Sequence, residues 1–190
     1  MERIQAIIPP EITWTEDDLF QFCQANRDLL IERDAQGQII IMAPSGGLTS
    51  QYNAGIIARL YAWNEKYKLG YVFDSSGGFM LPNGAMRAPD AAFVSREKWE
   101  NLSPEAQQKF PPVCPEFVIE LRSPTDRLKV LQAKMEEWIQ NGCRLAWLID
   151  PVEKQAFVYE ADGTIHQNTL EGVLNGGSVL PEFEFSLQIL

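Results

Sequence analysis

Histidine and cysteine are scarce in this 190-residue sequence. His166 is the single histidine, and Cys23, Cys114 and Cys143 are widely spaced and form no Cys-x-x-Cys pair. A structural zinc site needs four ligands of these types, and Ser-His or Cys-His catalysis would have only one histidine available. The odd number of cysteines indicates reduced thiols packed inside a cytoplasmic protein.

The sequence also lacks a long hydrophobic run and an excess of positive charge. No apolar stretch approaches the roughly 20 residues of a membrane span, and the first residues lack the basic start and apolar stretch of a signal peptide. The 16 Lys and Arg residues are outnumbered by 26 Asp and Glu, for a net charge of −10. Proteins that coat nucleic acid are usually basic, so any contact with nucleic acid must be local, through a small basic rim.

The composition of the sequence predicts one folded domain over residues 1–190. The hydrophobic fraction of 45% and the charged fraction of 22% are ordinary for a globular protein, and we find no repeat or linker. The expected fold class is α/β, with antiparallel hairpins that feed a mixed sheet. The patterns predict an extended arm over 1–13, hairpins over 29–42 and 155–169, a helix over 49–67, a strand over about 88–94 and an edge strand over 183–187.

Residues 117–150 predict a parallel crossover unit. An apolar run over 117–121 is followed by a sharp turn, a helix that ends at Gly142, and a second apolar run over 145–149. Two buried strands joined by a helix form a parallel βαβ unit that is nearly always right-handed. We therefore expect these two strands to be neighbours in the centre of the sheet.

Glu120 is the anomaly of that unit, because it is a carboxylate in a strand that is otherwise apolar. Burial of a carboxylate costs several kcal/mol unless it is paired or binds a metal. Alternation places Glu120 and Arg122 on one face of the strand. An ordinary explanation is therefore an ion pair between Glu120 and Arg122 or Arg127.

Two further residues are candidates for a site with Glu120. Asp90 follows Pro89 at the start of a predicted strand, where it could also simply bond a nearby backbone N–H. Lys134 lies at the border of the apolar face of the crossover helix, where it could also be an ordinary snorkelling lysine. Together, two carboxylates could bind Mg²⁺ or Mn²⁺, and a lysine could orient a water and stabilise a phosphodiester transition state.

Several segments carry a resemblance to a known family. They are residues 40–47 (IIMAPSGG), 72–79 (VFDSSGGF), 81–90 (LPNGAMRAPD), 117–124 (FVIELRSP), 131–137 (LQAKMEE), Gly142 and 147–151 (WLIDP). With these segments the chain resembles the Uma-type family of putative restriction endonucleases, a branch of the PD-(D/E)xK nuclease superfamily. The resemblance runs from Thr15 to the C-terminus and implies a restriction-endonuclease-like fold and a Mg²⁺-dependent DNA endonuclease.

The resemblance also implies roles for particular residues. Asp90 is similar to the first metal-binding acid of the superfamily and Glu120 to the second, and Glu32 is similar to an N-terminal acid that assists the metal site. The superfamily has Glu-x-Lys on one strand, whereas Arg122 stands here in place of the lysine. Arginine does not give up its proton, so Arg122 would support charge on the phosphate, and Lys134 would supply the lysine from the helix.

Two expectations concern partners and activity. A homodimer acting on DNA is expected from the resemblance, because two copies of one site can cut both strands and twofold dimers are the commonest oligomers. The alternative is a catalytically inactive nuclease-fold protein that binds nucleic acid or acts as an oligomeric interaction module. The net charge of −10 and Arg122 favour that alternative.

Overall fold

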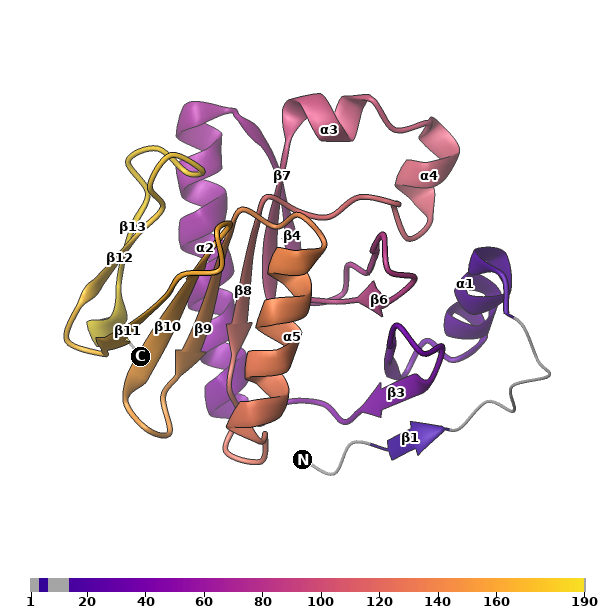
Figure 1. Cartoon of the computed structure of the whole chain (residues 1–190), viewed down its shortest axis with the longest axis horizontal. Coiled ribbons are helices and arrows are strands. Elements are labelled where there is room, and N and C mark those ends of the chain that lie inside the picture. The colour runs from indigo at the N-terminus through magenta and orange to yellow at the C-terminus, as the bar shows by residue number, and fades with distance from the viewer. Residues whose placement is uncertain (1–3, 7–13, 190) are drawn as a thin grey trace.

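A six-stranded mixed sheet forms the centre of the protein (Figure 1). The computed structural model describes residues 4–6 and 14–189. In spatial order the strands are β11 (Ile165–Thr169), β10 (Gln155–Glu160), β9 (Leu145–Asp150), β8 (Phe117–Leu121), β7 (Ala91–Ser95) and β4 (Gly70–Asp74). β8 and β9 are parallel and the other neighbours are antiparallel, which confirms the predicted α/β class and mixed sheet.

A second sheet is built mainly from the N-terminal part of the chain. Its order is β1 (Ile4–Ala6), β3 (Ile39–Met42), β2 (Leu30–Arg33), β6 (Met86–Arg87) and β5 (Phe79–Met80). Helix α1 (Glu16–Ala25) packs on it through Leu19, which lies in one apolar cluster with Ile31 and Ile39. The hairpin of β2 and β3 confirms the prediction for residues 29–42.

Two helices cover opposite faces of the large sheet, α2 (Gly47–Tyr67) behind it and α5 (Leu128–Gln140) in front (Figure 1). The alternation of β8 explains this arrangement. Ile119 lies in the core that includes Leu60 of α2, whereas Val118 lies in the core that includes Leu131 and Met135 of α5. A strand with apolar residues on both faces is thus buried on both sides, as parallel strands require.

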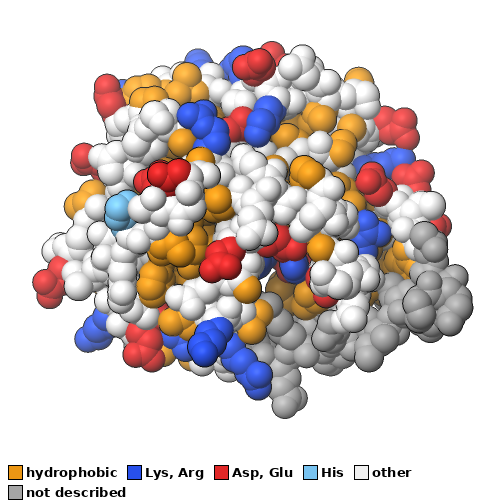
Figure 2. Space-filling model, viewed as in Figure 1, with side chains coloured by type: hydrophobic (Ala, Val, Ile, Leu, Met, Phe, Trp, Pro, Cys, Tyr) orange, Lys and Arg blue, Asp and Glu red, His pale blue; other side chains and the backbone are white. Residues whose placement is uncertain are grey.

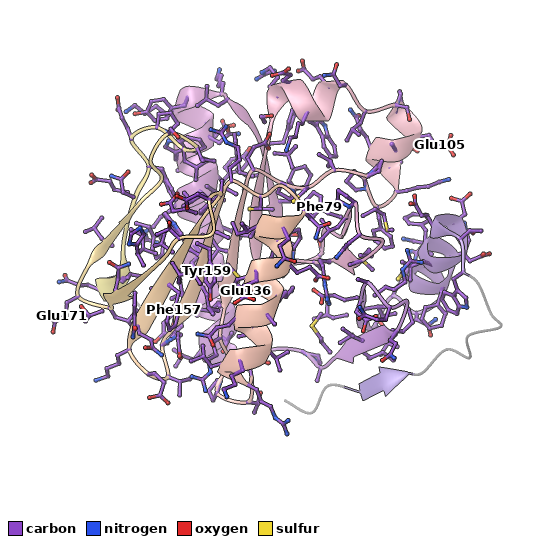
Figure 3. The ribbon with its side chains drawn as sticks, viewed as in Figure 1. Phe79, Glu105, Glu136, Phe157, Tyr159 and Glu171 are labelled. Carbon is purple, nitrogen blue, oxygen red and sulfur yellow. The ribbon has the colours of Figure 1, made fainter. Side chains whose placement is uncertain are left out.

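Helix α5 connects β8 to β9 as the predicted crossover. Figure 3 shows Phe157 and Tyr159 of β10 beside α5, close to Glu136. Burial, reinforced by the negative charge of Glu136, raises the pKa of Tyr159 to about 12. The helix ends at Gly142, whose φ of +103° is a conformation that favours glycine.

The predicted strand over about 88–94 is confirmed from Ala91 onward, but it begins three residues later than expected, because the chain bends at Pro89 between two sheets. Met86–Arg87 is β6 of the small sheet, and Ala91–Ser95 is β7 of the large sheet. Between them Pro89 has no N–H to give to a ladder, and the N–H of Ala88 donates to the Glu32 carboxylate at 3.0 Å. The chain passes from the small sheet to the large sheet at this bend, and Asp90 is the last residue of the bend before β7.

The predicted C-terminal edge strand is present as β13 (Glu184–Ser186), with Phe185 buried and Glu184 exposed. It pairs with β12 (Val173–Asn175) in a separate two-stranded sheet, and a 3₁₀ turn η1 (Leu187–Ile189) follows. Short helices α3 (Arg96–Glu100) and α4 (Pro104–Gln108) lie between β7 and β8. Most of the predicted N-terminal arm lies outside the described residues.

Among the described residues, no helix reaches the length and hydropathy of a membrane-spanning helix, and this includes α2, the longest of them.

Candidate functional site

A cavity of about 480 Å³ lies between the two sheets. Its walls come from the end of α1, from β2, from the first turns of α2, from the bend before β7, from the end of β8 and from α5. Asp90, Glu120 and Lys134 all line it. The three residues that the sequence predicts to form one site therefore border the same cavity.

Asp90 is held by hydrogen bonds to both of its carboxylate oxygens. The Asn53 side chain donates to Oδ1 at 2.7 Å, and the Leu121 N–H donates to Oδ2 at 2.7 Å. Burial raises the pKa of Asp90, although the Leu121 N–H, the Lys134 charge and the Asn53 amide act against the rise. The predicted backbone hydrogen bond is thus present, and it ties Asp90 to the end of β8.

Lys134 and Glu120 form the centre of the site. Lys134 Nζ lies 2.7 Å from Glu120 Oε1 and 2.6 Å from Glu32 Oε1, and it donates to the carbonyl oxygen of Ala88 at 3.3 Å. The indole N–H of Trp138 donates to the same Glu120 oxygen at 3.2 Å. Lys134 is buried, so it is not a snorkelling surface lysine, and Glu120 pairs with it rather than with Arg122 or Arg127.

The protonation of this pair follows from burial and from the neighbouring charges. Burial, with the charges of Asp90 and Glu32, raises the pKa of Glu120 to about 7, although Lys134 opposes the rise. Burial alone would lower the pKa of Lys134, but Glu120 and Glu32 outweigh it and raise that pKa above its ordinary value. Lys134 is therefore a fixed positive charge, and Glu120 titrates near neutrality.

Glu32 is fully buried and belongs to a second layer of charges. Besides Lys134 and the Ala88 N–H, it pairs with Arg87 at 3.0 Å, and Arg87 in turn contacts Glu137 of α5 at 2.5 Å. Burial would raise the pKa of Glu32, but Lys134 and Arg87 lower it overall. Glu32 therefore remains ionised and shares the Lys134 ammonium with Glu120.

Arg122 does not join this group. Its guanidinium donates to Asp150 at 2.7 Å and to the carbonyl oxygen of Asp126 at 3.2 Å, so it is occupied at the ends of β8 and β9. Arg122 directly follows β8, and its backbone N–H donates to the carbonyl oxygen of Ile149, so its side chain pairs with Asp150 instead of Glu120. The expected support of a phosphate by Arg122 thus has no geometric basis here.

Three residues of the site were not identified from the sequence. Asn53 and Arg87 carry no periodic signal, because their partners come from distant segments. Trp138 is the third, and its indole N–H donates to Glu120. Its spacing of four residues from Lys134 was a usable signal, because residues four apart share a helix face.

The donor set fits a divalent cation in charge and in chemistry. Two cations, Lys134 and Arg87, face four carboxylates, which are those of Asp90, Glu120, Glu32 and Glu137. Carboxylate oxygens are the ligands that Mg²⁺ and Mn²⁺ prefer, and such ions keep several waters. Within residues 4–6 and 14–189, no group of three or more His, Cys, Asp or Glu side chains is arranged to hold a metal ion, and the assignment of Glu32 to a metal site stays a prediction.

The surface has no concentration of basic residues on the face drawn in Figure 2. Lys and Arg side chains are scattered there among Asp and Glu side chains. Arg27, at the end of α1, is an exposed cation in the lining of the cavity.

Comparison with known proteins gives the class of protein to which this mixed sheet and its cavity belong. The profile of the Uma2 family, described as "Putative restriction endonuclease", matches residues 16–188, and the chain belongs to that family. Its fold is similar to the crystal structure of a putative nuclease belonging to DUF820 from Anabaena variabilis ATCC 29413. The TM-score is 0.70 at 18% identity, over 83% of this chain and 87% of that one. No curated protein matches the chain.

Proposed function

We propose that this protein is a DNA endonuclease that hydrolyses phosphodiester bonds with the help of a divalent cation. The observation that carries the proposal is the convergence of Asp90, Glu120 and Lys134 on one cavity between the two sheets. A bound Mg²⁺ or Mn²⁺ would supply a Lewis acid and an activated water. Asp90 and Glu120 would hold it.

Each residue has a distinct task in this proposal. Asp90, held from two sides, presents its carboxylate in a fixed orientation. Lys134 keeps its proton, so it orients a water by donation and stabilises negative charge that develops on the phosphate. Glu120, whose Oε1 is held by Lys134 and Trp138, would be the second carboxylate that holds the cation.

The test is cleavage of supercoiled plasmid DNA in Mg²⁺ or Mn²⁺ by the wild type, Asp90→Ala and Glu120→Gln. We expect the wild type to nick or linearise the plasmid, and both variants to lose at least about 100-fold of that rate. Glu116→Gln is a matched control. Glu116 directly precedes β8 and is also buried, but it binds Ser95 and Lys98 away from the cavity. Cleavage that persists in Asp90→Ala and Glu120→Gln contradicts the site.

A second candidate is a nuclease-fold protein that binds DNA without cutting it. Two observations favour it, namely the net charge of −10 and the tight pairing of Lys134 with two carboxylates. Calorimetric titration with Mn²⁺ separates the two candidates. Binding that disappears in Asp90→Ala supports the endonuclease, and no binding in either protein supports the second candidate.

We also propose that the protein acts as a homodimer, because two sites related by a twofold axis can cut both strands of a duplex. Size-exclusion chromatography with light scattering gives the mass in solution. A mass of one chain, 21.5 kDa, at micromolar concentration contradicts the proposal.

A further inference from the structure

Asn53 lies in α2 and reaches the candidate site from the face of the sheet opposite α5. Its side-chain N–H donates to Asp90 Oδ1 at 2.7 Å, and the residue lines the cavity. Its carbonyl oxygen, Oδ1, is buried and has no hydrogen-bond donor among the residues that the structure describes. One end of this amide is therefore committed to Asp90, and the other end is not used by the protein.

The orientation of the amide follows from its partner. An ionised carboxylate only accepts hydrogen bonds, so the N–H end of Asn53 must face Asp90. The oxygen then points away from Asp90 and cannot be exchanged with the nitrogen without the loss of that bond. Since a buried acceptor without a partner is costly, such groups in native proteins are usually satisfied by a bound water or a ligand.

A second asparagine of the same helix shows what a purely structural amide looks like. The Asn64 side chain donates to the carbonyl oxygen of Gly70 at 2.8 Å and accepts from the Gly70 N–H at 3.2 Å. Both ends of Asn64 are used, and they tie the end of α2 to β4. Asn53 has the same chemistry but leaves its acceptor free beside the cavity.

We propose that Asn53 is a positioning and water-binding residue of the site: its N–H orients the Asp90 carboxylate, and its free carbonyl oxygen accepts a hydrogen from a water held in the cavity. The catalytic consequence rests on the proposed endonuclease function. The water-binding part does not, because it requires only the amide, Asp90 and the cavity. A water fixed between Asn53 and Asp90 would be placed where a hydrated divalent cation has its bound waters.

Three variants test this proposal through Mn²⁺ affinity, measured by calorimetry without DNA. Asn53→Leu keeps the shape and removes both polar ends, and we expect Mn²⁺ affinity to fall about tenfold, as is usual when an outer partner of a metal site is removed. Asn53→Asp keeps an oxygen toward the cavity but loses the N–H that orients Asp90, so we expect a smaller loss of affinity than in Asn53→Leu. Asn64→Leu is the control, and it should lower the free energy of unfolding without changing Mn²⁺ affinity.

The outcomes separate this proposal from the proposed function. If the wild type does not cleave DNA but Asn53→Leu still weakens Mn²⁺ binding, the endonuclease fails and the role of Asn53 stands. If the wild type cleaves DNA and Asn53→Leu equals it in cleavage and in Mn²⁺ affinity, the role of Asn53 is overturned. An equal loss of Mn²⁺ affinity in Asn53→Asp and Asn53→Leu also overturns it.

A crystal structure of the metal-free wild type provides a readout that does not depend on a cation. We expect an ordered water within hydrogen-bond distance of Asn53 Oδ1. A well-resolved site with no water at that oxygen overturns the proposal, whatever the Mn²⁺ titrations give.

Discussion

Two buried carboxylates stand at the ends of neighbouring parallel strands, Asp150 of β9 and Glu120 of β8, and each is paired with a cation. Asp150 accepts four hydrogen bonds. Its donors are Arg122, the Gln155 side chain and the N–H groups of Val152 and Glu153. These four donors satisfy both oxygens of Asp150, and a carboxylate satisfied in this way is a structural element.

Glu120 is held differently. The hydrogen bonds and the ion pair that it makes within the described residues all fall on Oε1, from Lys134 and Trp138. Asp90 and Glu32 add negative charge nearby, and the carboxylate faces a cavity. The comparison teaches that burial of a charge does not identify a site. A site is indicated when the buried charges are unbalanced and border an open space.

Among the variants that test this difference between Glu120 and Asp150, Lys134→Met should lose the most unfolding free energy. The variant leaves Glu32 and Glu120 facing each other without a shared cation, and an unpaired buried charge costs about 3–5 kcal/mol. Urea denaturation in EDTA should show that loss of unfolding free energy. Cleavage measured below the unfolding transition should also fall at least about 100-fold. A folded Lys134→Met protein that retains its stability would contradict the pairing.

Arg122→Met tests the structural half of the comparison. Asp150 keeps three of its four donors in this variant, so the expected loss of unfolding free energy is smaller, about 1–3 kcal/mol. Because the guanidinium is turned toward Asp150, plasmid cleavage by the folded variant should stay within about twofold of the wild type. A loss of cleavage as large as that of Lys134→Met would return Arg122 to the catalytic group.

The pH dependence of stability tests the imbalance at Glu120. Its folded-state pKa of about 7 lies above its ordinary value of 4.5, so the folded protein holds the proton more tightly than the unfolded chain. The resulting stabilisation is fully present below pH 4.5 and is lost as the pH rises to about 7. Glu120→Gln removes this dependence.

Relative to the wild type in EDTA, Glu120→Gln should therefore gain unfolding free energy across that interval, on the order of 1–3 kcal/mol, and nothing further above it. The measurement is a series of urea titrations at different pH values. Glu116→Gln, analysed in parallel, gives the effect of the same substitution at a carboxylate away from the cavity. Parallel curves for the wild type and Glu120→Gln would contradict the raised pKa.

The fold was predictable where the signal was local. The crossover unit over 117–150 was identified from apolar periodicity, because each of its elements buries a regular face against its neighbours in the chain. The start of β7 was predicted about three residues too early, because the sequence does not show that the chain bends at Pro89 between two sheets. Hydrogen bonding by Ala88 to Glu32, 56 residues away, ends the ladder there.

The residue types of the site could be predicted from the sequence, but the ion-pair partners of its side chains could not. Alternation placed Arg122 on the face of Glu120, but the rotamer and the partner of a long side chain depend on the neighbouring strand, which supplies Asp150. The wheel position of Lys134 was compatible with the site, whereas its burial depends on Glu32 from another sheet. Asn53 gave no signal, since an asparagine in a long helix has many ordinary uses.

The smallest effect is expected at an ion pair of similar chemistry that lies in solvent. Arg96 and Glu100 form an i,i+4 pair at 3.0 Å with side chains about half exposed. Water already solvates both charges, so Arg96→Ala should lower the unfolding free energy by only about 0.5 kcal/mol or less and leave cleavage unchanged. A urea titration beside Lys134→Met provides the check. If the two variants lose similar stability, burial is not what distinguishes the charges at the cavity, and the contrast between Glu120 and an ordinary ion pair fails.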